Sequence, residues 1–326
     1  MMDLSTTYLG IKLPSPLIVG SGPLGDEIDS AKALEDAGAS MIVLRSLFEE
    51  EVVGEQMDAF KYLDGYGDSF AEAGSFSPAA DAILGPDEYL EHIRAIKAAV
   101  RIPVAASLCG MTRTGWISYA RLIEDAGADA LELHLYHPAS DMATPAAEVE
   151  RQFVDLVRDV KRSLRIPVAV KLAPLYTAFA HLAKQIDDAG ADGIVLFTRF
   201  HRVDIDVEEL EIIRTRQLSH PSELTMRLRG AAALSGRVRA SIAISGGVHT
   251  GLEVIKATMA GAHVTQLVSA LLKNGPEYLR IVRSEIELWM HEHEWTSLNE
   301  MRGNMSLGKI PDPAAYERAN FRMALR

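Results

Sequence analysis

The chain has 326 residues, of which 48% are hydrophobic and 24% charged, so it is long enough to bury a large core. A formal net charge of −12, without a run of Lys or Arg, disfavours a nucleic-acid-binding or anionic-membrane surface. The single cysteine, Cys109, excludes an internal disulfide and any metal site built from several cysteines of one chain. Residues 1–22 show neither a signal-peptide pattern nor a long apolar span, so we expect a soluble cytoplasmic protein without nucleic-acid or membrane partners.

Eight short apolar runs alternate with amphipathic segments along the chain. They cover 15–22, 41–46, 101–108, 130–135, 165–172, 193–197, 241–247 and 264–268. Before several of them a phrase recurs in which a helix ends at a glycine and a buried strand follows: "EDAGAS", "EDAGAD", "DDAGAD" and "TMAGAH". Alternating buried strands and helices indicate the α/β class, and eight units favour a (β/α)8 TIM barrel over an open doubly wound sheet.

Two long segments interrupt the even spacing of these units. Residues 48–86, after the second strand, are acidic and rich in Gly and Ser, and we expect a lid-like insertion there. A second insertion, 198–224, follows the sixth strand, and 296–326 form a polar C-terminal extension. We therefore predict a single barrel domain over 1–326, with both insertions at the C-terminal ends of strands, where barrel enzymes carry their sites.

Strand periodicity places several polar side chains inside the barrel. The predicted inward residues are Arg45, Ser107, Glu132, His134 and Lys171, and His137 comes just after its strand. Because a buried unpaired cation is costly, Lys171 should meet either an anionic or electron-rich ligand or the carboxylate of Glu132. His134 and His137 fall on opposite faces of one strand, so we expect no metal site.

The segment "SGGVHTG" (245–251) joins an apolar run to an amphipathic one. Adjacent glycines at the start of a helix leave backbone N–H groups available, which is the usual arrangement for holding a phosphate. The segment is therefore a candidate phosphate site, and the pattern alone does not identify the molecule to which a phosphate would belong.

Several sequence blocks, taken in chain order, resemble those of the dihydroorotate dehydrogenases of the soluble class 1 type. The resemblance is carried by "SPLIVGSG", "PVAASLCGMT", "LELHLYHP", "VAVKLAPLY" and "AISGGVHTGLEVIKATMAGAHVTQLVSALLKNGP", and it covers nearly the whole chain. It implies an FMN-containing TIM barrel of pyrimidine biosynthesis. Such an enzyme oxidises dihydroorotate to orotate by proton abstraction and hydride transfer to flavin N5.

The resemblance also implies roles for individual residues. The implied catalytic residues are His137, at the place of the family's cysteine base, and Lys171, beside the N1–C2 edge of the flavin. The implied cofactor-binding residues are Gly20, Ser21, Gly22, Arg45, Ser107, His134, Lys171, Ser245, Gly246, Gly247 and Ser269.

Several positions depart from the family pattern. Arg45 stands where the family usually has lysine, and His134 where it has asparagine. The family's second phosphate loop, "GT", reads Val268–Ser269 here, and its lid motif is absent from 48–86. The asparagine pair that follows strand six in the family is replaced by "LFTRFHR". The flavin-binding pattern is thus mostly kept, whereas the substrate-binding loops differ.

Three functions fit these observations. The first is an FMN-dependent dihydroorotate dehydrogenase with His137 as base, and the second is a related FMN oxidoreductase acting on another small cyclic or unsaturated substrate. The third is a flavin-free barrel that binds a phosphorylated metabolite, or a non-catalytic subunit. We expect a homodimer, with an electron-transfer partner chain as a further possibility.

Overall fold

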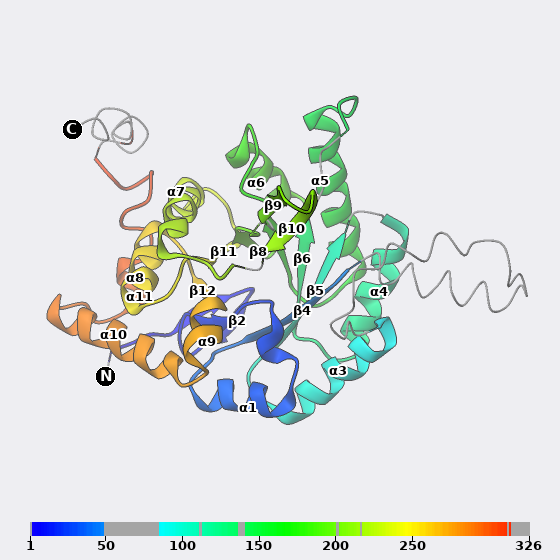
Figure 1. Ribbon diagram of the computed structural model, residues 1–326. Coiled ribbons are helices and arrows are strands. Elements are labelled where there is room, and N and C mark those ends of the chain that lie inside the picture. Colours follow the sequence, from blue (N-terminus) through cyan, green and yellow to red (C-terminus); the bar gives the residue numbers. More distant parts are fainter. Residues whose placement is uncertain are drawn as a thin grey trace, which may run out of the picture.

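The structure is a computed structural model that describes residues 2–48, 85–110, 113–135, 141–199, 202–215, 217–311 and 313. Eight parallel strands close into a barrel (Figure 1). In barrel order from the N-terminal strand they are β3 (Leu17–Val19), β4 (Ile42–Phe48), β5 (Val104–Gly110), β6 (Ala130–Leu135), β7 (Val168–Leu172), β8 (Gly193–Leu196), β11 (Ser241–Ser245) and β12 (Val264–Leu267). Each of the eight predicted apolar runs overlaps one of these strands, and the (β/α)8 prediction is confirmed.

Helices follow the strands and surround the barrel (Figure 1). The longer ones are α1 (Ile28–Asp36), α3 (Pro86–Ala99), α4 (Arg113–Asp125), α5 (Ala146–Ser163), α6 (Phe179–Asp188), α7 (Leu224–Leu234), α8 (Gly251–Ala260) and α10 (Tyr278–Glu292). Shorter turns are α9 (Ser269–Asn274), α11 (Leu298–Met301) and the 3-10 helices η1 (Pro23–Gly25) and η3 (Pro221–Glu223). Within the described part of the chain, none of the helices has both the length and the apolar composition needed to cross a membrane.

The recurring "AGA" phrase ends helices as predicted. Its glycine has positive φ each time: 102° at Gly38, 95° at Gly127, 104° at Gly190 and 120° at Gly261. In three of these repeats, the acidic residue three positions before the glycine holds the loop that precedes a strand further along the chain. A carboxylate oxygen accepts two consecutive backbone N–H groups in each case: Glu35 from 101 and 102, Glu124 from 165 and 166, and Asp187 from 239 and 240. The repeat thus stabilises the N-terminal face of the barrel.

The barrel interior has an apolar lower layer. A hairpin of β1 (Thr6–Tyr8) and β2 (Ile11–Leu13) closes this end and contributes Tyr8, Leu9 and Leu13. They pack on inward residues of the barrel: Ile18, Met41, Val43, Ala105, Ala130, Ala169, Val195, Ala243 and Val264. The contact is tight, since a Cβ on Gly193 would lie 2.5 Å from Cδ2 of Leu9. Above this layer the interior becomes polar.

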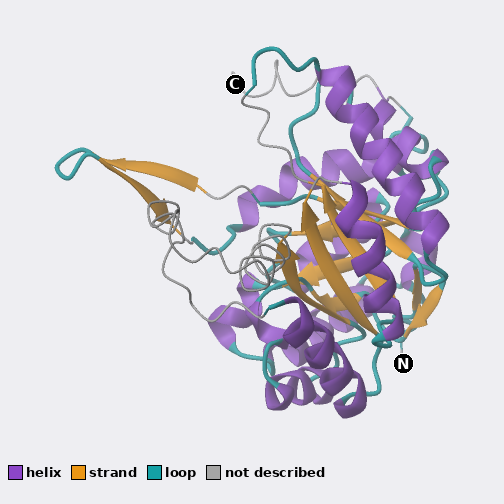
Figure 2. Ribbon diagram, turned by 90° about the vertical axis from the view of Figure 1, so that its right-hand side faces the viewer, coloured by secondary structure: helices purple, strands orange, loops and turns teal. Residues whose placement is uncertain are grey.

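A second hairpin follows β8, within the segment where the sequence analysis placed its second insertion. It consists of β9 (Arg202–Asp206) and β10 (Glu211–Thr215), and Figure 2 shows it extending away from the barrel. Ile205 and Ile212 are directly paired across it and are 66% and 69% exposed. One face of the hairpin is therefore aliphatic and open.

The structure describes only part of the predicted lid-like insertion and part of the predicted C-terminal extension. Residues 49–84 and 314–326 lie outside the described residues. The described part of the extension packs on α7 and α8, because the N–H groups of Gly303, Met305 and Leu307 donate to carbonyls of Thr258, Met259 and Ala232.

Candidate active site

Lys171 lies in a closed hydrogen-bonded triad in the upper part of the barrel. Its Nζ lies 3.0 Å from Oε1 of Glu132 and 3.3 Å from Oε1 of Gln266, and Nε2 of Gln266 donates to Oε2 of Glu132 at 2.6 Å. The three residues come from β7, β6 and β12 and are 9%, 2% and 1% exposed. Both predicted inward positions are confirmed, and the ion pair with Glu132 is present. An ammonium group has three donors, so a third remains after these two contacts.

A row of serines lines the same end of the interior. Ser46 Oγ lies 2.7 Å from Ser107 Oγ and 3.2 Å from Ser21 Oγ. Ser107, predicted to point inward, is fully buried. The row connects the loop after β3 with β4 and β5.

The prediction that Arg45 points into the barrel is wrong, and Ser46 continues the inward row instead. The register between β4 and β5 shifts between Val43 and Ser46, which is the signature of a β-bulge. Arg45 forms an ion pair with Asp26 in the loop after β3, and its side chain is 40% exposed. A one-residue bulge changes the face of every side chain after it, and simple alternation cannot reveal this.

Tyr89 of α3 supports the bulge from outside the barrel. Its hydroxyl lies 2.8 Å from the carbonyl oxygen of Arg45 and 3.2 Å from that of Ser107, and it accepts the N–H of Ser107 at 2.9 Å. Burial raises the pKa of Tyr89, so the hydroxyl keeps its proton and remains a donor. The buried tyrosine therefore satisfies backbone groups that the shifted register leaves without their regular ladder partners.

The predicted phosphate loop stands between the end of β11 and α8. Gly246 and Gly247 have φ values of 90° and 76°. A Cβ on Gly247 would lie 2.6 Å from the backbone nitrogen of Leu224, so both conformation and packing require glycine there. Within the described residues, the N–H groups of Gly246 and Gly247 form no hydrogen bond. The loop is thus a glycine-lined set of donors ahead of a helix.

Arg227 of α7 lies directly beneath this loop. Its Nε donates to the carbonyl oxygen of Ser245, its Nη1 donates to that of Glu223 at 2.6 Å, and its Nη2 lies 3.8 Å from Oε2 of Glu223. The side chain is buried, which lowers its pKa, yet the guanidinium remains charged at neutral pH. A Cβ on Gly246 would be 2.8 Å from Nη2. A buried cation therefore supports the loop and adds positive potential to it.

The other predicted cofactor residues gather on the neighbouring strands. Ser269 begins α9 just after β12, and its Oγ accepts the N–H of Ser219 at 2.9 Å. A Cβ on Gly20 would lie 2.9 Å from Cβ of Gln266, and one on Gly22 would lie 3.1 Å from Cγ1 of Val268. The pairing of β3 with β12 thus brings the "GSG" segment against the second predicted phosphate loop.

Of the two histidines that were predicted in the site, His134 lies among the described residues and His137 does not. Nε2 of His134 lies 2.6 Å from Oγ1 of Thr198, which follows β8 and is buried. His137, the predicted base, lies outside the described residues. Its role stays a prediction.

Sequence reasoning missed four residues of this region: Ser46, Thr198, Arg227 and Gln266. The position of Gln266 could have been predicted from the sequence. It alternates with the outward Leu267 on the last strand, so the period-two rule places its side chain inside the barrel. Arg227 gave no signal, since it lies on a helix that passes beneath the loop from another part of the chain.

Comparison of the sequence with known proteins shows the family of the chain. Residues 3–290 match the family model described as dihydroorotate dehydrogenase.

The chain belongs to the dihydroorotate dehydrogenase family.

Similar members include the dihydroorotate dehydrogenase B (NAD(+)) catalytic subunits of two archaea. The Thermoplasma acidophilum protein is 27% identical over 307 residues, which cover 93% of this chain and 99% of the relative. The Methanocaldococcus jannaschii protein is 25% identical over 307 residues, covering 92% and 97%. A shorter match is to the NAD-dependent dihydropyrimidine dehydrogenase subunit PreA of Escherichia coli K12, 28% identical over 197 residues, covering 59% and 47%. The protein is an oxidoreductase of the dihydroorotate dehydrogenase type.

Proposed function

We propose that the protein is an FMN-dependent oxidoreductase that converts dihydroorotate to orotate. The observation that carries the proposal is the buried Lys171–Glu132–Gln266 triad in the same barrel mouth as a glycine loop with available N–H donors. Family membership supports the reaction class, and the site's own residues support the cofactor.

The residues of the barrel mouth fit FMN in two respects. A phosphate needs converging donors without Cβ atoms, and Gly246 and Gly247 provide them above the buried cation of Arg227. A flavin ring needs a cation near its N1–C2 edge, which Lys171 would provide. The segment of Gly20 and Gly22, packed against Gln266 and Val268, would border the ring. When bound, FMN supplies a two-electron acceptor, which amino-acid side chains lack.

The roles of the chain's own residues follow from this placement. Ser245, Gly246, Gly247 and Ser269 would hold the phosphate, while Ser21, Ser107 and His134 would contact the polar edge of the ring. Lys171, fixed by Glu132 and Gln266, would place its third N–H on the ring. Arg45, held at the mouth by Asp26, would border the ring from outside. His137 would remove the substrate proton, since imidazole is a suitable base near neutral pH.

A second candidate is the oxidoreduction of a different dihydropyrimidine. It is favoured by the relative named as a dihydropyrimidine dehydrogenase subunit and by the departures from the family's substrate loops. Dihydroorotate carries a carboxylate that dihydrouracil lacks, so the two substrates make different demands on cationic groups at the mouth.

The deciding experiment is the visible absorption spectrum of the purified protein, recorded anaerobically before and after each substrate. Bleaching of a flavin spectrum by dihydroorotate supports the proposal, whereas bleaching by dihydrouracil alone supports the second candidate. A protein that takes up no FMN after reconstitution contradicts both and leaves the flavin-free phosphate-binding barrel.

The predicted partners remain part of the proposal. Relatives named "catalytic subunit" support an electron-transfer partner chain, and the exposed Ile205 and Ile212 support contact with a second chain. Light scattering of the wild type and Ile212→Asp tests this point. We expect a dimer that dissociates in the variant, and a monomeric wild type would contradict the homodimer.

A further inference from the structure

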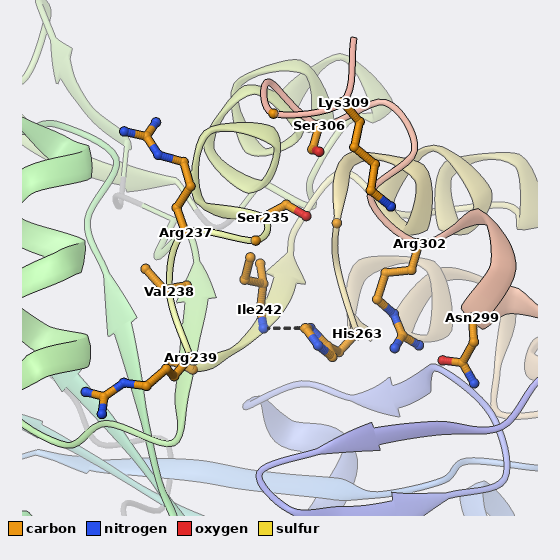
Figure 3. A pocket seen from close by; sticks show the side chains of 14 residues that line it. Ser235, Arg237, Val238, Arg239, Ile242, His263, Asn299, Arg302, Ser306 and Lys309 are labelled. Carbon is orange, nitrogen blue, oxygen red and sulfur yellow. Dashed lines mark hydrogen bonds between the residues drawn. The ribbon is translucent and has the colours of Figure 1, made fainter.

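A cavity lies at the opposite end of the barrel from the candidate active site. Its volume is about 540 Å³, within the range of about 300–1,000 Å³ of small-molecule sites. The walls come from the loop between α7 and β11, the turn before β12 and the segment 299–309 (Figure 3). This end of a TIM barrel normally serves stability rather than catalysis.

The charge of the cavity lining is opposite to that of the whole chain. Arg237, Arg239, Arg302 and Lys309 line it, and its lining residues include no Asp or Glu. The chain as a whole has a formal net charge of −12. Cations gathered in a concave site of an acidic protein create a local field that attracts anions.

Two of these side chains lie near each other and two do not. In Figure 3 the side chain of Lys309 extends toward the stem of Arg302, whose guanidinium lies beside His263 and Asn299, whereas the side chains of Arg237 and Arg239 turn away from the cavity. Arg239 is also occupied elsewhere, because its guanidinium lies 3.5 Å from Asp187 and 3.6 Å from Asp188. Arg302 and Lys309 are therefore the pair that a ligand would meet.

Arg302 is held in place by one hydrogen bond, and its Nε–H donor has no acceptor among the described residues. Its Nη2 donates to Oγ1 of Thr6 at 2.7 Å, and that hydroxyl donates to the carbonyl oxygen of His263 at 2.9 Å. Its Nε is buried and, among the described residues, has no acceptor. A buried donor without a partner is costly, and a bound anion would recover that cost.

Neutral donors complete the lining. Ser306 is buried, and Figure 3 shows its hydroxyl and that of Ser235 on the wall of the cavity near Lys309. Nδ1 of His263 accepts the N–H of Ile242 at 3.0 Å, so the neutral ring carries its proton on Nε2. A guanidinium, an ammonium and hydroxyl donors in one small cavity match the acceptor oxygens of a phosphate group.

We propose that this cavity is a second ligand site, which binds the phosphate group of a small phosphate monoester between Arg302 and Lys309. The volume leaves room for an organic moiety beyond the phosphate. The site lies at the start of β11 and β12, whereas the candidate FMN phosphate loops lie at their ends, so both sites can be filled together.

The test is isothermal titration calorimetry on FMN-saturated protein, so that the loop at Gly246 is already occupied. The titrants are inorganic phosphate, ribose 5-phosphate and adenosine monophosphate. We expect saturable binding of a monoester that is tighter than that of inorganic phosphate. Equal affinities for all three would overturn the monoester, and no saturable binding of any would overturn the site.

Variants assign the signal to the cavity. Lys309 is exposed, so Lys309→Ala should fold normally and raise the Kd about tenfold. Arg302→Gln removes the second cation and should raise it at least as much. Lys32→Ala, an exposed lysine on α1, is the matched control and should leave the Kd unchanged. A Kd that stays the same in Lys309→Ala and in folded Arg302→Gln would refute the proposal.

A further variant distinguishes a failure of this second site from a failure of the proposed function. Gly247→Ala should impair the FMN loop and leave the monoester titration intact, even in a protein that has lost its flavin. Loss of both binding events in a Gly247→Ala protein that remains folded would mean that the titrant binds the FMN loop, and this too would refute the second site.

Discussion

Nζ of Lys171 lies 3.0 Å from Oε1 of Glu132, and their side chains are only 11% and 2% exposed. An ion pair this deep gains little net stability, because desolvation of both charges offsets their attraction. What the pair does provide is a lysine held in one orientation by a carboxylate and an amide. A group that must present one donor to a ligand benefits from that restriction.

Our first prediction separates the stability of this pair from its function. Lys171→Met leaves a buried carboxylate without its cation and should lower the free energy of unfolding by about 3 kcal/mol or more. Combining it with Glu132→Leu removes both charges and should recover most of that loss. Flavin reduction by substrate should stay impaired in both proteins. Urea denaturation and stopped-flow absorbance measure the two effects, and wild-type reduction rates in the double variant would exclude a catalytic role for Lys171.

The second prediction concerns the glycine loop. Gly247→Ala places a Cβ 2.6 Å from the backbone of Leu224 at a φ of 76°, so the loop must shift and FMN affinity should fall by tenfold or more. Gly10→Ala is the matched control, because Gly10 has a φ of 74° and open space around it. That variant should cost about 1 kcal/mol of stability and leave FMN binding unchanged. Flavin fluorescence quenching gives both Kd values, and equal losses in the two variants would contradict the loop's role.

The third prediction tests the support beneath that loop. Arg227→Met removes the side-chain donors to the carbonyl oxygens of Ser245 and Glu223, which should cost about 2 kcal/mol. FMN affinity should fall about tenfold, because the loop loses both its anchor and its nearby positive charge. Arg229→Met, an exposed position two residues later on the same helix, should change neither quantity. An Arg227→Met protein that binds FMN like the wild type would show that Arg227 is structural only.

The eight strands and the helix ends were predictable because their signals are local. Each apolar run carries its own period, and each "AGA" phrase carries the glycine that its turn requires. The positions of Gly246 and Gly247 were predictable for the same reason, since two adjacent glycines between a strand and a helix are typical of a phosphate-binding loop.

The remaining parts of the site depend on information that is not local. The bulge that moves Arg45 aside and turns Ser46 inward is visible only in the register with β5. Arg227 reaches the phosphate loop because α7 packs beside β11, which no spacing in the sequence reveals. The hairpin around Tyr8, which closes the lower end of the barrel, could not be predicted either. Its short strands pair with each other and not with the barrel, so they carry no barrel-strand pattern.

The fourth prediction is a pH dependence of stability that originates at His263. Burial and the charge of Arg302 lower the pKa of His263 from 6.5 to about 4 in the folded protein. Between these values the unfolded chain binds a proton that the folded protein does not, so stability falls as the pH drops from about 6.5 to 4. The total loss from this residue should be about 3 kcal/mol, and it is absent above pH 6.5.

His263→Asn provides the comparison, because its side-chain carbonyl can accept the N–H of Ile242 in place of Nδ1 without titrating. The variant should therefore lose less stability than the wild type over the same interval, as measured by urea denaturation at pH 4.5, 5.5 and 7. His291→Asn changes an exposed histidine on α10 and should leave the wild-type slope as it is. Identical slopes for the wild type and His263→Asn would show that the acid sensitivity arises elsewhere. A shallower slope in His263→Asn alone would assign it to the N-terminal face of the barrel, away from the flavin end.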